Sequence, residues 1–118
     1  KLNNQIIKSY KNFGYCKINK KNYIDKIVEK NTISNNPGND NMMIGSFWFK
    51  KGAYFFENYV EAKRKKLTIN DEYYVGNNIN LLLKNKYKFV IFEIDQWISL
   101  GDPFELKMFE YWKNLFEI

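Results

Sequence analysis

The feature that most constrains the fold is a strand signal followed closely by a helix signal in the last third of the chain. Residues 87–94 read Tyr-Lys-Phe-Val-Ile-Phe-Glu-Ile, and β-branched and aromatic residues favour strands. Downstream, Asp102, Pro103 and Glu105 occupy the N-cap, first and third positions of a predicted helix that runs to about Phe116. A chain with both signals is expected to layer helices against a sheet.

Two further strand regions precede this pair of signals. Residues 14–18 and 23–30 flank a polar turn, and extended runs in this arrangement predict a β-hairpin. Residues 42–49 are apolar on both faces, which is typical of a strand covered by helices on both sides of a sheet. Gly45 interrupts that run, and a glycine there indicates either the close approach of a ligand or tight packing under a helix.

Helical spacing of apolar residues fills most of the remaining chain. It marks residues 5–13, 53–65 and 70–85. Asn70 or Asp71 is the expected N-cap of the last of these helices. The order hairpin, strand, helix, helix, strand, helix predicts an α/β fold.

The composition excludes several kinds of chemistry. The 118 residues include no histidine and a single cysteine, Cys16. A Ser-His-Asp triad, a histidine-ligated zinc and an internal disulfide are therefore excluded. Cys16 lies in the first predicted strand, where we interpret it as a small buried hydrophobe. Any catalysis must use carboxylates, lysines, backbone dipoles or a hard metal ion.

The net charge of +6 favours an anionic ligand, such as a nucleotide, a sugar phosphate, a nucleic acid or a membrane surface. The basic run at residues 63–66 closes a predicted helix and so suits the helix dipole; the other interpretation is a phosphate or nucleic-acid patch. No apolar run reaches the ~20 residues of a membrane span. No secretory signal is visible, so we expect a cytoplasmic protein without a membrane partner.

Four segments of the chain form an ordered set. They are residues 27–30 (Ile-Val-Glu-Lys), 44–50 (Ile-Gly-Ser-Phe-Trp-Phe-Lys), 70–75 (Asn-Asp-Glu-Tyr-Tyr-Val) with Asn80 following, and 97–106 (Trp-Ile-Ser-Leu-Gly-Asp-Pro-Phe-Glu-Leu). In order and spacing they resemble the second half of the sugar-phosphate nucleotidyltransferases of the capsule and lipopolysaccharide type. The resemblance covers roughly residues 14–112.

The resemblance implies that residues 1–118 are the C-terminal portion of a single nucleotidyltransferase domain. It implies part of a Rossmann-like mixed sheet with flanking helices, and a nucleotide-binding portion that precedes Lys1. The reaction would join a nucleoside triphosphate to a sugar 1-phosphate, or to a similar phosphate such as phosphocholine, with release of pyrophosphate. Mg²⁺ would be the cofactor of the complete enzyme, which would serve surface polysaccharide synthesis, and this portion would be inactive alone.

The resemblance also implies a substrate site. Its substrate-binding residues are Glu29, Lys30, Gly45, Trp48, Glu72 and Tyr74. Lys30 would place a positive charge on the substrate phosphate, and Glu29 would accept hydrogen bonds from substrate hydroxyl or amino groups. The same pair is otherwise interpreted as an exposed strand end. Trp48, Tyr73 and Tyr74 would line the pocket, although aromatic residues with such spacing are more often part of a core.

The position at which many members of that family carry a metal-binding Asp is occupied by Ser99. A hydroxyl is a poorer Mg²⁺ ligand than a carboxylate. Asp95 and Asp102 are the remaining candidate metal ligands, and Asp102 is also the predicted helix cap.

Two functions from other classes stay open. The charge allows a basic nucleic-acid-binding module, but the positive residues are interspersed with acidic ones and no compact basic–aromatic motif is present, so nucleic acid is the disfavoured partner. The chain would alternatively be a non-catalytic domain that completes or assembles an enzyme. An incomplete sheet leaves an edge and an apolar face uncovered, which favours a homo-oligomer.

Overall fold

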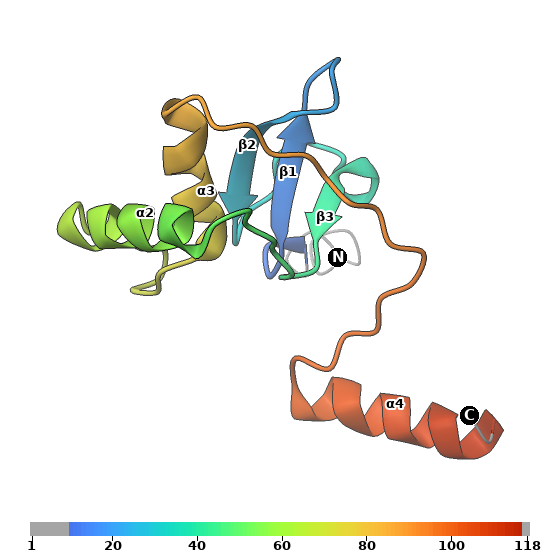
Figure 1. Cartoon of the computed structure of the whole chain (residues 1–118). Coiled ribbons are helices and arrows are strands. Elements are labelled where there is room, and N and C mark those ends of the chain that lie inside the picture. Colours follow the sequence, from blue (N-terminus) through green and yellow to red (C-terminus); the bar gives the residue numbers. More distant parts are fainter. Residues whose placement is uncertain (1–9, 117–118) are drawn as a thin grey trace.

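The computed structural model describes residues 10–116, and these form a mixed α/β fold (Figure 1). The strands are β1 (Gly14–Ile18), β2 (Ile24–Glu29) and β3 (Asn41–Met43). The helices are the 3-10 turn η1 (Pro37–Asn39) and the α-helices α2 (Gly52–Arg64), α3 (Val75–Lys84) and α4 (Pro103–Phe116). The α/β class predicted from the sequence is confirmed. The helix predicted over residues 5–13 lies mostly outside the described residues.

The three strands form an antiparallel sheet in the order β2-β1-β3. The predicted hairpin of β1 and β2 is confirmed, and its turn is organised by Asn19. The Asn19 Oδ1 atom accepts hydrogen bonds from the backbone N–H groups of Lys21 (2.8 Å) and Tyr23 (3.2 Å). An asparagine that binds its own turn in this way fixes the hairpin locally.

The core lies between the hairpin and α3, and α2 packs on α3 (Figure 1). Its centre is a cluster of four buried residues, Cys16, Ile24, Ile27 and Ile79. Cys16 is only 5% exposed, so its interpretation as a strand hydrophobe is confirmed. Burial raises the pKa of the Cys16 thiol, which keeps this thiol protonated and unreactive at neutral pH.

The outer edge of β2 is closed by a side chain rather than by another strand. The Asn80 amide on α3 accepts a hydrogen bond from the Ile27 N–H (2.9 Å) and donates one to the Ile27 carbonyl (2.8 Å). Closer to the turn, the Ile24 N–H donates to the Phe89 carbonyl at 2.8 Å. Asn80 therefore copies the pair of hydrogen bonds that a neighbouring strand would make.

The strand predicted over residues 42–49 is wrong beyond its first two residues. β3 ends at Met43, and Gly45 has a φ of +85°, a left-handed conformation that leaves the extended strand geometry. Trp48 is 80% exposed, so the predicted burial of this segment on both faces is also wrong.

The strand predicted over residues 87–94 is likewise wrong. The segment is joined to the hairpin through one isolated bridge, Tyr23 to Val90, and Phe92 is 92% exposed. A strand preference is expressed only where a neighbouring backbone is free to pair. The edge of β2 is already occupied farther along by Asn80.

The two later helices differ in how well the sequence located them. α3 begins at Val75, not at residue 70, because Asn70 (φ 50°) and Asp71 (φ 62°) form a left-handed turn closed by mutual Ile69 and Glu72 hydrogen bonds. Neither Asn70 nor Asp71 therefore caps α3 as expected. α4 begins where the sequence predicted, and it lies apart from the sheet (Figure 1).

Candidate functional site

The carboxylate of Glu29 lies in a slot at the end of β2. The Gly76 N–H donates a hydrogen bond to Glu29 Oε1 at 3.1 Å. A Cβ atom at Gly14 would collide with Glu29 Oε2, and one at Gly76 would collide with Oε1. The slot therefore exists only because both of its walls are glycine. Burial raises the pKa of Glu29, while the Gly76 hydrogen bond and the charge of Lys30 act in the opposite direction.

This placement gives Glu29 a structural role. The N-cap residue of α3, Tyr74, makes no side-chain cap hydrogen bond. Glu29, 47 residues away in the sequence, accepts from the Gly76 N–H in the first turn instead. A carboxylate at a helix N-terminus is favourably placed against the helix dipole. One oxygen of Glu29 therefore caps α3, and the other faces Gly14.

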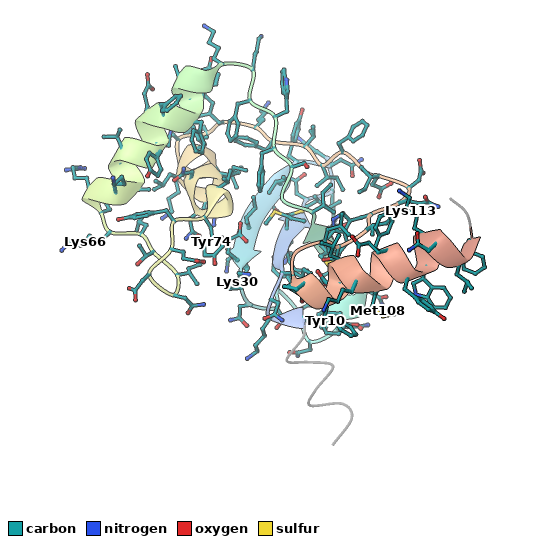
Figure 2. The ribbon with its side chains drawn as sticks, turned by 90° about the horizontal axis from the view of Figure 1, so that it is seen from below. Tyr10, Lys30, Lys66, Tyr74, Met108 and Lys113 are labelled. Atoms are coloured by element: carbon teal, nitrogen blue, oxygen red, sulfur yellow. The ribbon has the colours of Figure 1, made fainter. Side chains whose placement is uncertain are left out.

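Lys30 follows directly and turns back over the end of the sheet. Its backbone is left-handed, with a φ of 54°. The Lys30 Nζ atom donates to the Asn12 carbonyl at 2.8 Å and lies 5.7 Å from the centroid of the Tyr74 ring. Figure 2 shows Lys30 and Tyr74 close to each other beside the end of β2. The ammonium group is therefore positioned by a carbonyl and an aromatic ring, an arrangement that allows cation–π attraction.

Tyr74 is in turn bound to the second carboxylate of the site. Its hydroxyl donates to Glu72 Oε2. This hydrogen bond, together with burial and the charges of Glu72 and Glu29, raises the pKa of Tyr74 to about 12. Tyr74 thus remains a protonated hydrogen-bond donor at any physiological pH.

Four of the six residues implied by the resemblance therefore lie together, and with Gly76 we name them the Glu29 cluster: Glu29, Lys30, Glu72, Tyr74 and Gly76. The other two, Gly45 and Trp48, lie outside this cluster. The sequence analysis did not identify Gly14 and Gly76 as walls of the site. No sequence signal pairs either glycine with Glu29, because the three residues meet only through the tertiary fold.

A second surface feature is an open groove of about 470 Å³, which we name the apolar groove. Its lining residues are Gly45, Phe47, Phe49, Gly52, Phe55, Phe56 and Val75. Val75 precedes Gly76, so the apolar groove and the Glu29 cluster adjoin at the start of α3. Gly45 contributes to the groove with no atom within 4 Å of the position that its Cβ would take.

Two of the three residues considered for a metal, Ser99 and Asp102, have other partners at the start of α4. Asp102 Oδ1 accepts from the N–H groups of Phe104 (2.8 Å) and Glu105 (2.9 Å), so its interpretation as a helix cap is confirmed. The Ser99 hydroxyl donates to Glu105 at 2.5 Å. Asp95 lies in the extended segment before α4. Within residues 10–116, no three acidic, cysteine or histidine side chains gather in a way that would hold a metal ion.

The basic run at the end of α2 is explained locally. Lys65 forms an ion pair with Glu61 one turn earlier (2.5 Å), and the Lys63 ammonium lies 5.6 Å from the Tyr59 ring centroid. Lys63 and Arg64 occupy the last turn, where positive charge is favourable. The run thus closes a helix. None of the described helices is long and apolar enough to cross a membrane.

Comparison of the chain with protein-family models, with curated proteins and with solved structures gave no match. The function is therefore argued from the chemistry of the Glu29 cluster.

Proposed function

We propose that the chain is the substrate-holding part of a nucleotidyltransferase, and that the Glu29 cluster binds a small phosphorylated molecule that also carries hydroxyl or amino groups. The observation that carries the proposal is that the end of β2 and the start of α3, 47 residues apart, bring a lysine, two carboxylates and a tyrosine hydroxyl together. Sugar 1-phosphates have this chemistry, and phosphocholine would present its trimethylammonium cation, rather than a hydrogen-bond donor, to the carboxylates.

The charges of the cluster favour a ligand with two unlike ends. Lys30 attracts a phosphate, and its ammonium group lies over the Tyr74 ring. Glu29 and Glu72 accept hydrogen bonds from hydroxyl or amino groups at the other end of the ligand. Two carboxylates beside one ammonium repel a continuous polyanion, so these charges argue against the nucleic-acid alternative.

The complete reaction requires groups beyond this cluster. Attack of the bound phosphate on the α-phosphorus of a nucleoside triphosphate releases pyrophosphate and depends chiefly on positioning and charge neutralisation. In this proposal the nucleotide and Mg²⁺ bind to a portion of the enzyme that precedes Lys1. The three strands would then be the edge of a larger Rossmann-like sheet in a cytoplasmic enzyme of surface polysaccharide synthesis.

Isothermal titration of the chain with glucose 1-phosphate, phosphocholine and inorganic phosphate tests the proposal. We expect Lys30→Ala to weaken binding about tenfold or more, because a hydrogen bond to a charged group contributes roughly 1.5–3 kcal/mol. Lys88→Ala is the matched control, since the Lys88 ammonium also lies over a tyrosine ring, 5.3 Å from the Tyr23 centroid. Equal losses in the two variants, or no binding of any of the three phosphates, would contradict the proposal.

An assembly role is the second candidate function, and it is favoured by the apolar surface that α4 leaves uncovered. The two candidates differ in a simple respect. The first requires a phosphorylated ligand at the Glu29 cluster, whereas the second requires only a protein partner.

A further inference from the structure

The last part of the chain forms an arm, residues 98–116, that lies apart from the rest of the fold (Figure 1). Trp97 anchors its base through an edge-to-face contact with Phe13, with 5.9 Å between ring centroids. Beyond Trp97 the chain is extended up to α4, and α4 is not packed against the sheet, α2 or α3. The arm therefore carries a helix that has no tertiary support within the described chain.

α4 has the surface of a buried helix. At about 100° per residue, its main apolar face covers roughly 160° of the circumference. The residues of this face are Phe104, Met108, Phe109, Tyr111, Trp112, Leu115 and Phe116. Phe104 is 71% and Phe116 is 63% exposed. Two glutamates and two lysines give α4 no net charge, so α4 itself adds nothing to the repulsion between two chains of net charge +6.

The apolar groove offers an apolar surface to the apolar face of this helix. It is open and lined mainly by phenylalanines, and Phe56 at its rim is 65% exposed. Amphipathic helices bind such grooves through anchors spaced one turn apart. Trp112 and Phe116 are spaced in this way and stack on each other with 5.7 Å between centroids.

We propose that α4 of one copy docks into the apolar groove of a second copy, so that two copies exchange arms. Mutual docking of the same element in two copies forms a closed dimer with two-fold symmetry, the commonest kind of oligomer. The extended segment after Trp97 separates α4 from its own body and lets it reach a neighbour (Figure 1).

The apolar area is large enough for a stable dimer. The exposed parts of the aromatic and aliphatic side chains on the α4 face amount to roughly 600 Å² per arm, since an aromatic side chain has about 150–250 Å² of surface. Two arms together therefore expose roughly 1,200 Å², which is the lower end of the roughly 1,200–2,000 Å² of total surface buried in a specific interface.

Sedimentation equilibrium of the full chain tests the proposal. We expect a dimer with twice the chain mass of 14.3 kDa. The arm variant Trp112→Ser with Phe116→Ser should be monomeric, and the groove variant Phe56→Ser should be monomeric too. The control Lys107→Ser with Lys113→Ser alters the polar face of α4 and should stay dimeric. Circular dichroism checks that each variant is folded, and because α4 is detached from the body, the arm variant leaves the sheet intact.

Mixing the arm variant with the groove variant is the sharpest step. The groove variant has an intact arm and the arm variant has an intact groove, so one docking contact can form and a one-armed heterodimer should appear. A monomeric unaltered chain would overturn the proposal, whether α4 stays free or folds back onto its own groove. A groove variant that stays dimeric while the arm variant dissociates would overturn it in favour of pairing between two α4 helices. None of these outcomes depends on phosphate binding at the Glu29 cluster.

Discussion

Glu29 combines two tasks in one side chain. It caps α3 through the Gly76 N–H, and it presents a carboxylate beside Lys30 and Tyr74. The Glu29 carboxylate can be buried because Gly14 and Gly76 leave room for it. The helix N-terminus also favours its negative charge and so offsets part of the desolvation penalty. These local contacts explain why a charged group lies at this position. They also mean that Glu29 contributes separately to stability, through the cap, and to binding, through its charge.

The substitution Glu29→Gln separates those two contributions. Because burial raises the pKa of Glu29, its contribution to stability is complete below the ordinary value of 4.5 and is lost as the pH rises through the raised pKa. Glutamine keeps an oxygen for Gly76 and carries no charge. At neutral pH we expect Glu29→Gln to be at least as stable as the unaltered chain. Below pH 4.5 we expect it to lose that advantage. We also expect it to bind phosphorylated ligands more weakly. Urea unfolding at both pH values, with ligand titration, measures this; marked destabilisation at neutral pH would contradict it.

The substitution Gly76→Ala tests the slot directly. The new methyl group would meet the Glu29 carboxylate and the Ile27 side chain, so we expect a loss of about 1–3 kcal/mol in the free energy of unfolding. Gly52→Ala is the matched control at a helix start, where no atom lies within 4 Å of the new position. That change should stabilise the chain by about 0.5–1 kcal/mol. Thermal or urea unfolding compares the two variants, and equal effects would show that Glu29 does not occupy the slot.

The raised pKa of Tyr74 gives a spectroscopic test of the same cluster. Tyr74 stabilises the fold fully below its ordinary pKa of 10.0, and this contribution is lost as the pH rises towards about 12. Glu72→Gln removes the negative charge that accepts the Tyr74 hydrogen bond, so we expect the pKa of Tyr74 to fall. Ultraviolet titration of tyrosinate, taken as the difference from Tyr74→Phe, isolates this group. An unchanged titration in Glu72→Gln would show that the two side chains are not in contact.

At the scale of elements, the edge of β2 decides how the rest of the chain is arranged. Asn80 binds both backbone groups of Ile27, so α3 is attached to the hairpin by hydrogen bonds as well as by apolar packing. The same contacts occupy the position where residues 87–94 would otherwise add a strand. That segment remains extended and largely exposed, and only Phe89 and Val90 reach the hairpin backbone.

The substitution Asn80→Ala should therefore destabilise the chain more than the removal of most other polar side chains would. It leaves a donor and an acceptor of Ile27 without partners in a partly buried place, and each unsatisfied group costs about 1–3 kcal/mol. We expect a loss of about 2 kcal/mol or more in urea unfolding. Asn77→Ala, three residues earlier on α3, is the control and should change stability by less than about 0.5 kcal/mol. A small effect at Asn80 would mean that the edge of β2 is closed by other contacts.

For the whole molecule, the sequence predicted the features that depend on neighbouring residues and missed those that depend on tertiary contacts. The hairpin at Asn19 and the start of α4 at Asp102 follow from side chains that bind their own backbone neighbours, and both were found. The strands over residues 42–49 and 87–94 were predicted from composition alone, but a strand also needs extended backbone and a free neighbour. Gly45 interrupts the first segment with a left-handed conformation, and Asn80 occupies the edge of β2 beside the second.

The candidate site shows the same division. The resemblance to a family motif named Glu29, Lys30, Glu72 and Tyr74 together, and the structure places these four side chains near one another. The glycine walls of the Glu29 slot were not found, because Gly14 and Gly76 meet the carboxylate only after β2 and α3 have packed. The separation of the arm from the body was also not predicted, since the pattern of α4 shows an apolar face but not what covers it.

The most direct test of the central claim, that the Glu29 cluster is the ligand site, is an amide NMR titration of the isotope-labelled chain with glucose 1-phosphate. We expect saturable shifts of the Lys30 and Gly76 amide signals, because these groups lie at the ligand and at the cap of α3. The amide signals of Gly45 and Gly52 in the apolar groove are internal controls and should move little. Shifts confined to the groove, or no saturable shift at Lys30 and Gly76, would contradict the account.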